Sequence, residues 1–528
     1  MIPNDQRARG PHPALVFVLT FAALLALHAP LLRLPYFWDE AGYYIPAARD
    51  LWLTGSLIPH STVSNAHPPL VMAYLALWWK LAGFAPIVTR TAMLLAASFA
   101  LLGLFRLGKA VANLEVAVAA TVLTAIYPVF FAQSSLAHLD LAAAGFTFWG
   151  LRAYLQSRGW QSALWFSLAS LTKETAILAP LALFAWDVLA STALSARLPV
   201  RDGSNENRNS VLLLVPLLPL AAWYGFHYWR TGFVFGNPEF FRYNVAATVH
   251  PLRILLSLLI RLWQTFGYFR LLMLTLAVVF AMWLRPLRDP DGERPRIALD
   301  AQFAMLAVIV AYVFAMALVG GAELARYMLP VVPLVILIGV STLWRRVRRW
   351  RWLVALLGLM FVAGWFTNPP YGFAPEDNLA YRDYIRLHQR AEEFLEARYP
   401  MARVLTAWPA SDELTHPYLG YVTRPMQVVR IENFAAGQLT AAAGLPSGES
   451  RPDFAVALVF STKDEPAHPL LENWELWQEW KTRFFGYHRD VPPATAAQIL
   501  GGNLVYSETR NQEWIGVIEI QRPVAAKN

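Results

Sequence analysis

Long apolar runs alternate with short polar loops over the first two thirds of the chain. About 20 helical residues, each rising about 1.5 Å, cross the hydrocarbon layer of a bilayer. Two apolar segments, 68–83 and 251–266, leave the number of spans open between eleven and thirteen. The eleven spans that the pattern predicts lie near residues 13–32, 88–107, 112–132, 138–155, 160–172, 174–193, 211–229, 268–285, 301–320, 329–344 and 352–367. The chain is therefore predicted to be a mainly α-helical, polytopic membrane protein.

Basic residues gather in alternate loops of this eleven-helix pattern. Arg7 and Arg9 precede the first span, and the run RRVRRWR at residues 345–351 precedes the last. Such loops are typical of the cytoplasmic side, so the chain is expected to begin inside the cell and to leave its last span outside. The stretch from Arg230 to Arg270 is an exception, because it carries five arginines on the side expected to be outside. It is either a folded element or a site for something anionic.

The pattern changes after Phe366, where apolar runs of membrane length end. Helical periodicity and short β-rich runs alternate from there to the C-terminus, which is typical of an α/β domain. The helical patterns lie near 378–398, 433–444 and 471–486, and the β-rich runs are ARVLTA, QVVRIEN, DFAVALVF and GVIEIQ. We therefore expect two domains, a membrane domain over residues 1–367 and a soluble, extracytoplasmic α/β domain over residues 368–528.

Composition supports this class and excludes others. Of the 528 residues, 56% are hydrophobic and 15% are charged, which is too apolar for a soluble protein. The net charge of +8 comes largely from loops between apolar spans, so nucleic-acid binding is not expected. The chain has no Cys, which rules out disulfides, thiolate metal sites and thiol catalysis. The abundance of Arg and the absence of Cys favour a bacterial inner membrane.

No spacing of His, Asp and Glu in the sequence forms a recognised metal motif. His67, His138, Glu239 and His250 are residue types that bind zinc, yet they are scattered along the chain. We therefore predict no metal ligand and no certain cofactor, while a divalent metal stays possible.

Polar side chains survive beside the apolar spans at five places, all on the side predicted to be outside. Ionisable residues at such depth are expensive and are commonly functional. The five places hold Asp39 and Glu40; Asn65 and His67; His138 and Asp140; Lys173 and Glu174; and Glu323, Arg326 and Tyr327. Their convergence on one membrane face predicts an active site there.

A structural alternative stands beside each functional interpretation. Asp39 could cap the helix that follows it, and Lys173 could extend its ammonium to the lipid headgroups. Arg326 and Tyr327 could anchor a helix end at the interface, and Asp140 could pair with a buried arginine for structure alone. The residues by themselves leave these alternatives open.

The order of the motifs resembles that of the GT-C glycosyltransferases. An Asp-Glu pair follows the first span, HPPL follows at 67–70, an Asp opens a later helix, a Thr-Lys pair ends at Lys173, and RYMLPVVP occupies 326–333. The nearest branches are the protein O-mannosyltransferases and the lipid A aminoarabinose transferases. The resemblance implies juxtamembrane helices in the first outer loop and transfer of a sugar from a polyprenyl-phosphate carrier on the extracytoplasmic side.

The resemblance also implies roles for the polar residues. Asp39 and Glu40 are therefore assigned as the catalytic pair. Asp39 resembles the family's catalytic Asp, which would deprotonate the acceptor so that the sugar is transferred with inversion. Cations placed at the leaving phosphate lower the barrier. The donor phosphate is therefore assigned to Lys173, Arg326, Tyr327 and His67, and substrate binding or structural support to Asp140, His138, Asn65, Glu174 and Glu323. Ala66 and His67 before the Pro-Pro pair are closer to the mannosyltransferase pattern than to the aminoarabinose-transferase one.

A transporter or flippase of lipid-linked sugars is the alternative function. Its charges would line a path near the bilayer midplane, whereas here they gather at one face, which favours the enzyme. The expected partners are a polyprenyl-phosphate-linked sugar, membrane lipids, and a lipid, glycan or protein acceptor, including lipid A.

Overall fold

A computed structural model describes residues 11–191, 210–238, 241–242, 248–290, 292–444, 453–462 and 473–521. Two compact units make up the protein. The first consists of Met1–Leu32 and Pro46–Trp365, and the second of Arg33–Ile45 and Phe366–Asn528. The chain thus enters the second unit twice, first with a short segment after the first helix and again with its C-terminal third. Arg7 and Arg9 lie outside the described residues.

The first unit is helical. Six helical segments within the described ranges are long and apolar enough to cross a membrane, namely Pro13–Leu31, Pro86–Val111, Glu174–Ser191, Ser210–Thr231, Pro251–Met282 and Leu299–Leu318. Three shorter apolar helices accompany them, Leu70–Ala82, Leu114–Ile126 and Trp350–Gly364. The prediction of a mainly α-helical, multi-pass membrane protein is confirmed. The number of eleven to thirteen spans remains a prediction.

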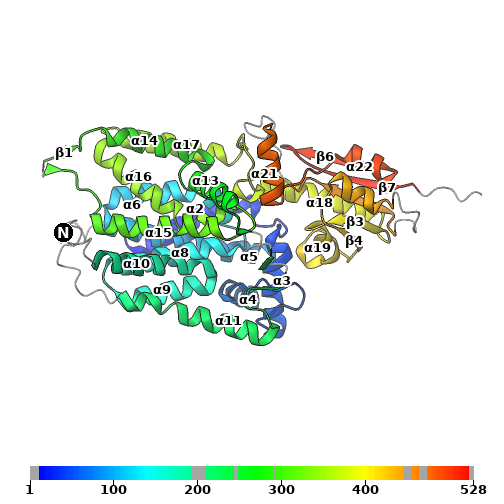
Figure 1. Ribbon diagram of the computed structural model, residues 1–528, viewed down its shortest axis with the longest axis horizontal. Helices are drawn as coiled ribbons and strands as arrows, with labels where there is room; N and C mark the ends of the chain where they lie inside the picture. The colour runs from blue at the N-terminus through cyan, green and yellow to red at the C-terminus, as the bar shows by residue number, and fades with distance from the viewer. Residues whose placement is uncertain are drawn as a thin grey trace, which may run out of the picture. The chain divides into compact units, whose positions relative to one another are not determined.

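The α-helices of this unit follow the predicted order of apolar runs (Figure 1). Their bounds are α2 (Pro13–His28), α3 (Ile45–Thr54), α4 (Leu70–Ala82), α5 (Pro86–Val111), α6 (Leu114–Ile126), α7 (Pro128–Gln133), α8 (Leu139–Leu155), α9 (Gly159–Thr172), α10 (Leu178–Ser191), α11 (Leu217–Thr231), α13 (Pro251–Phe266), α14 (Leu271–Met282), α15 (Leu299–Leu318), α16 (Val332–Arg346) and α17 (Trp350–Gly364). Shorter helical turns are η1 (Ala29–Leu31), η3 (Glu174–Ile177), η5 (Ser210–Leu214), η7 (Tyr268–Arg270) and η8 (Ala325–Met328), and a small hairpin pairs β1 (Arg288–Asp289) with β2 (Gly292–Glu293).

Backbone breaks divide two of the apolar stretches. The span predicted at 112–132 breaks at Tyr127, where Pro128 has no N–H to continue the helical hydrogen bonds and instead starts α7. Phe269 and Arg270 adopt positive φ angles of 44° and 69°, which separate α13 from α14. The first break was not predicted, because hydropathy alone does not register the missing N–H of Pro128. The second agrees with the predicted boundary between the segments 251–266 and 268–285.

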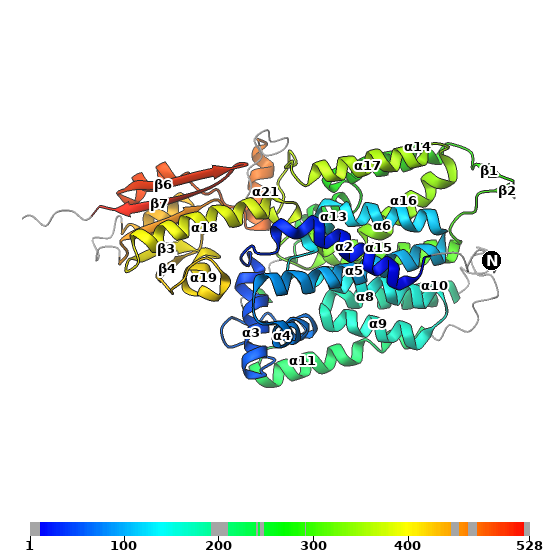
Figure 2. The same ribbon diagram turned by 180° about the vertical axis from the view of Figure 1, so that it is seen from behind.

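Small residues fix the position of α8 between α5 and α9. A Cβ atom on Gly145 would lie 2.9 Å from the Cβ of Ala100 on α5, and one on Gly150 would lie 2.8 Å from the ring of Phe166 on α9. Small residues let apolar helices approach closely where no hydrophobic force drives them together. The same helix α5 also contacts α2, which runs beside it in both views (Figure 2). The N-terminus of α8 is therefore held firmly in place.

The second unit contains a mixed five-stranded sheet in the order β4-β3-β5-β7-β6. Strand β3 is parallel to β4 and β5, and β7 is antiparallel to β5 and β6. The strands are β3 (Arg403–Ala407), β4 (Gln427–Ile431), β5 (Val456–Phe460), β6 (Gly502–Arg510) and β7 (Glu513–Ile520). The helices are α18 (Ala380–Arg398), α19 (Ala410–Thr415), α20 (Ala436–Ala442), α21 (Glu475–Phe485) and α22 (Pro493–Leu500), with turns η9 (Pro375–Asp377) and η10 (Pro417–Leu419). All four β-rich runs are strands, whereas the half-exposed β6 went unpredicted.

The segment Arg33–Ile45 is anchored to this unit through its backbone. Tyr36 donates its N–H to the carbonyl of Leu419 at 3.2 Å, and the hydroxyl of Tyr421 donates to the carbonyl of Tyr36 at 3.0 Å. Gly420 lies between these two contacts with φ at +96°, and a Cβ there would be 3.5 Å from Pro35. Only glycine adopts such a φ without strain. The turn at 419–421 is therefore built to receive this segment.

We expect Gly420→Ala to lower the free energy of unfolding by about 1–3 kcal/mol, because a side chain is strained at this φ. Denaturant titration in detergent micelles measures the change. Gly437→Ala is the matched control, since Gly437 lies in α20 with open space around it and helical Gly→Ala is neutral or stabilising by up to about 1 kcal/mol. Equal stability of the two variants would contradict the proposed strain.

Candidate active site

The turn that carries Asp39 and Glu40 separates the roles of the two carboxylates. Glu40 opens a π-helical turn, η2 (Glu40–Tyr44), and Asp39 stands before it without making a capping hydrogen bond. The buried Glu40 accepts a hydrogen bond of 2.9 Å at Oε2 from the backbone N–H of Phe37. Glu40 therefore stabilises the turn, and the helix-capping role considered for Asp39 is not observed. Asp39 itself is only half-buried.

Aromatic side chains of the second unit enclose this turn. Trp38 adopts a positive φ of 46°, which is costly for a bulky residue and must be maintained by its surroundings. Its ring meets those of Tyr384 and Trp408 edge to face, with centroids 5.5 Å and 5.1 Å away. Gly42 faces Trp408 so closely that a Cβ would lie 2.7 Å from the indole Nε1. The sequence alone gave no sign that Trp408 supports the segment of Asp39.

Three elements of the first unit bring one carboxylate and two cations together. Asp140 lies in the first turn of α8, Lys173 in the extended link between α9 and η3, and Arg326 in η8. Lys173 donates from Nζ to Asp140 Oδ1, and Arg326 Nε lies 3.3 Å from Asp140 Oδ2. The side chains are only 6%, 2% and 1% exposed for Lys173, Asp140 and Arg326. We call these three residues the Asp140 cluster, which sets two cations against one carboxylate.

Tyr327 and His138 flank the Asp140 cluster. Lys173 Nζ lies 3.9 Å from the centre of the Tyr327 ring, a distance at which the ring face attracts a cation. Arg326 Nη1 lies 3.2 Å from His138 Nδ1. His138 Nδ1 also lies 2.7 Å from Gln133 Oε1, and an amide oxygen can only accept, so Nδ1 donates to Gln133 and Nε2, at 3.4 Å from Arg326 Nη1, is the nitrogen that can accept from the guanidinium. Both residues thus adjoin the two cations, as the sequence interpretation anticipated for this face.

His67 and Asn65 lie in a loop that α11 holds in place. His67 Nδ1 forms a 2.9 Å contact with Glu174 Oε2, next along the chain to Lys173. Trp223 of α11 donates from its indole Nε1 to the carbonyl of Ala66 at 2.8 Å. Asn65 precedes Ala66 and is half-buried. The contact with Glu174 links this loop to the chain segment that carries Lys173.

Glu323 belongs to a second ion-pair group. Its Oε2 lies 2.8 Å from Arg261 and its Oε1 lies 3.4 Å from Arg253, and both arginines are buried side chains of α13. The guanidinium of Arg261 also lies 5.6 Å from the centre of the Tyr327 ring. Arg253 and Arg261 belong to the stretch from Arg230 to Arg270, whose arginines did not fit the predicted pattern of basic cytoplasmic loops. Both are internal ion-pair partners of Glu323. The two arginines are eight residues apart, which places both on one face of a helix. This spacing is the feature of the sequence that could have predicted a shared partner.

These contacts answer three of the questions that the sequence left open. The ammonium of Lys173 is buried against Asp140 and does not extend to the headgroups, and Arg326 is buried rather than interfacial. The pairing of Asp140 with a buried arginine is observed. Asp39 and Glu40 belong to the second unit and the Asp140 cluster to the first. A pocket shared by all of these residues remains a prediction.

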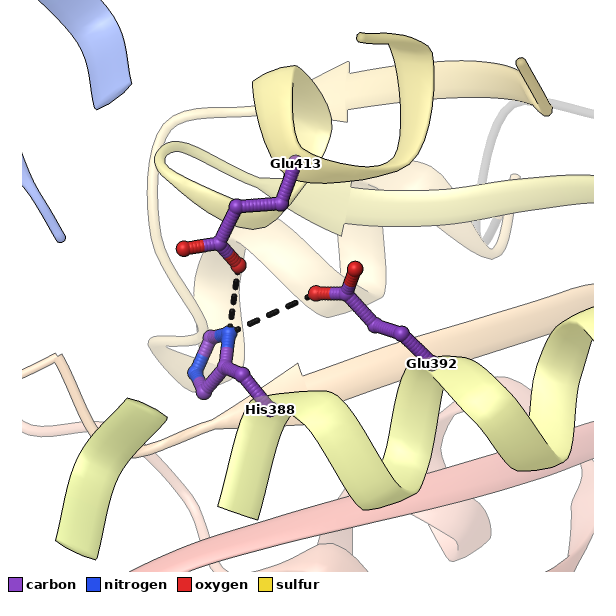
Figure 3. Close-up of side chains that lie close together, drawn as sticks. All are labelled: His388, Glu392 and Glu413. Carbon is purple, nitrogen blue, oxygen red and sulfur yellow. Dashed lines mark hydrogen bonds and ion pairs between the residues drawn. The ribbon is translucent and has the colours of Figure 1, made fainter. Parts of the chain in front are cut away.

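One group of side chains among the described residues could hold a metal. His388, Glu392 and Glu413 place one ligand atom each within 4.8 Å of one another (Figure 3). Burial and the neighbouring Glu413 carboxylate raise the pKa of Glu392 well above its usual range. Of the zinc-binding types considered from the sequence, Glu239 lies outside the described residues, and His67, His138 and His250 join no such group within them. His388 and Glu392 fall on the buried face of α18, a signal that the sequence analysis missed.

Comparison with known proteins identifies the fold. No protein-family model matches the sequence, and no curated protein matches it. The structure of ArnT from Cupriavidus metallidurans bound to undecaprenyl phosphate is 13% identical, with a TM-score of 0.51 over 96% of this chain and 97% of its own. Archaeal oligosaccharyltransferase AglB from Archaeoglobus fulgidus, in complex with an inhibitory peptide and a dolichol-phosphate, is 12% identical, with a TM-score of 0.48 over 98% of this chain and 75% of its own. The predicted likeness to GT-C membrane glycosyltransferases is confirmed as a likeness of fold.

We expect Asp140→Asn to lower the free energy of unfolding by about 3–5 kcal/mol, because two buried cations lose their only carboxylate in the cluster. Lys173→Met should cost about 1 kcal/mol, since one cation and one carboxylate remain in balance. Denaturant titration of both variants in detergent micelles measures the difference. A larger loss for Lys173→Met than for Asp140→Asn would contradict this account of the charges.

Proposed function

We propose that this protein, which shares its fold with ArnT, is an inverting glycosyltransferase. It moves a sugar from a polyprenyl-phosphate donor to a hydroxyl or phosphate of a lipid, glycan or protein acceptor. The reaction takes place on the extracytoplasmic face of the membrane, which we infer to be a bacterial inner membrane. The observation that carries the proposal is the Asp140 cluster, in which two buried cations share one carboxylate.

The excess positive charge of the cluster suits a phosphate. Burying a charge is costly unless an opposite charge compensates it, and a phosphodiester brings that charge together with the donor sugar. Arg326 can bind two phosphate oxygens through its planar guanidinium, whereas Lys173 acts as a point charge. Tyr327 and His67 complete the group of residues that we assign to the phosphate. The ArnT structure is bound to undecaprenyl phosphate, which matches this class of ligand.

Asp39 is the proposed general base. Asp39 is a half-buried carboxylate beside the turn that Glu40 stabilises, and a carboxylate can take the proton of the acceptor hydroxyl. The acceptor oxygen then bonds to the anomeric carbon from the face opposite the phosphate. The bond between that carbon and the phosphate oxygen breaks, and its electron pair leaves with the phosphate. Lys173 and Arg326 stabilise the negative charge that develops there.

Glu40, Trp38 and Trp408 position Asp39 in this mechanism. The hydrogen bond from Phe37 to Glu40 and the ring contacts of Trp38 fix the turn from both sides. Glu40 is thus assigned to support rather than to proton transfer, which narrows the catalytic pair of the sequence analysis to one residue. His138, Asn65, Glu174 and Glu323 are assigned to the support of the donor site.

Asp39→Asn should lower transfer of the sugar by about 10²–10⁴-fold, the usual contribution of a general base, while binding of the lipid phosphate persists. Glu40→Gln is the control for the same change of carboxylate to amide at the neighbouring position, because its amide oxygen can still accept the hydrogen bond from Phe37. Transfer is measured with purified protein and a radiolabelled polyprenyl-phosphate sugar. Full activity of Asp39→Asn would remove it as the base, and movement of lipid-linked sugar across vesicles without transfer would instead support a flippase.

Lys173→Met and Arg326→Lys should each weaken binding of undecaprenyl phosphate by roughly 10–100-fold, the range expected for a charge-assisted hydrogen bond of about 1.5–3 kcal/mol. Competition with a fluorescent prenyl phosphate on purified protein measures the affinity. Lys80→Met serves as the control, because Lys80 is an exposed lysine in the last turn of α4. Unchanged affinity in both cluster variants would place the phosphate elsewhere.

A further inference from the structure

The second unit buries three metal-ligating side chains at one point. His388 and Glu392 lie one turn apart on α18, and Glu413 comes from α19 (Figure 3). Their side chains are 1%, 0% and 0% exposed in that order. His388 Nδ1 lies 2.6 Å from Glu413 Oε2 and 3.5 Å from Glu392 Oε1. Two elements of the fold thus direct one imidazole and two carboxylates toward a common centre.

Several polar atoms at this centre have no hydrogen-bond partner. They are both carboxylate oxygens of Glu392 and Oε1 of Glu413. Nε2 of His388 is also unpartnered, but it points away from the two carboxylates (Figure 3). Folded proteins pair nearly all of their buried polar groups, with protein or with a bound group. The three unpartnered carboxylate oxygens therefore point to a bound group that satisfies them.

The charges of the three side chains point the same way. Within the described part of the chain, His388 is the only ion-pair partner of Glu392 and Glu413. One imidazole cannot balance two buried carboxylates, and an unbalanced buried charge costs several kcal/mol. Either a proton on Glu392 or a bound cation removes the imbalance. A cation also satisfies the orphaned carboxylate oxygens, which a single proton does not.

We propose that His388, Glu392 and Glu413 bind a divalent transition-metal cation of the zinc type. Imidazole nitrogen and carboxylate oxygen are ligands that zinc accepts at about 2.0–2.2 Å, usually with tetrahedral geometry. At such bond lengths neighbouring ligand atoms are about 3.3 Å apart, close to the 3.5 Å between His388 and Glu392. The Glu413 carboxylate, at 2.6 Å from the imidazole, needs to withdraw by less than about 1 Å. Three protein ligands leave a fourth position open.

The site is linked by packing to the segment of Asp39. The imidazole of His388 stacks on the ring of Tyr384, with centroids 4.1 Å apart. Tyr384 in turn meets Phe37 and Trp38 edge to face, at 5.3 Å and 5.5 Å. A metal that joins α18 to α19 would therefore stiffen the surface on which the turn before Asp39 rests. Its role is structural, and it takes no part in the proposed transfer reaction.

The test uses the full-length protein in detergent, treated with chelator and then titrated with Zn²⁺ or Mn²⁺ against a chromophoric competitor. The wild type should bind one equivalent of at least one of these ions, and that ion should raise its unfolding temperature by several degrees. Glu392→Gln and His388→Gln should each lower the affinity at least 10-fold and abolish the rise. Glu393→Gln, an exposed neighbour on the same helix, should behave like the wild type.

Glu392→Gln also distinguishes the two ways of removing the charge imbalance, a bound metal or a proton on Glu392. Gln mimics a protonated Glu392. If Glu392 is a protonated carboxyl with a purely structural role, this variant should match the wild type in stability with and without added metal. Absence of binding in the wild type, or equal binding by the wild type and both site variants, would overturn the proposal. If Glu392→Gln fails to fold, His388→Gln still tests whether these side chains bind the metal.

Discussion

The balance of charge around Asp140 is the constraint on which the first unit depends. Burying an ammonium, a guanidinium and a carboxylate is favourable only while the three remain in contact, so the ends of α8, α9 and η8 must meet at one point. Gly145 and Gly150 make this possible, because they allow α5 and α9 to approach α8 without a side chain between them. Helix packing and electrostatics thus support each other. A ligand that brings negative charge, such as the proposed donor phosphate, would relieve the remaining imbalance and so stabilise the helical unit.

Much of the fold was predictable because its signals are local. The apolar runs that became α5 and α15 are long enough to identify from hydropathy alone, and the runs ARVLTA and DFAVALVF carry the β-branched and apolar residues of buried strands. The grouping of Asp140, Lys173 and Arg326 was also predictable, since charged residues beside apolar spans must find partners. The different surroundings of the two carboxylates of the Asp-Glu pair were not, because they depend on the hydrogen bond between Phe37 and Glu40.

Other features depend on contacts between distant parts of the chain. From the sequence, the arginines of α13 could belong to a folded element or to a site for something anionic, because their partner Glu323 lies far along the chain. His388 and Glu392 resembled ordinary polar positions of an amphipathic helix, because neither reveals in sequence that α19 supplies Glu413. The contact between Tyr36 and Leu419 joins residues at opposite ends of the sequence. No periodicity within a window of residues reports such pairings.

The division of the second unit between Arg33–Ile45 and the C-terminal third has a consequence for biosynthesis. A ribosome adds about 5–20 residues per second, so the segment with Asp39 leaves it on the order of tens of seconds before its partners at Tyr384, Trp408 and Leu419 exist. During that interval Trp38 has no aromatic neighbours from the C-terminal third to hold its strained backbone. The nascent chain therefore carries the turn of Asp39 without the aromatic contacts that support it, and a polypeptide released before Tyr384 would contain the apolar helices up to α17 yet lack those contacts.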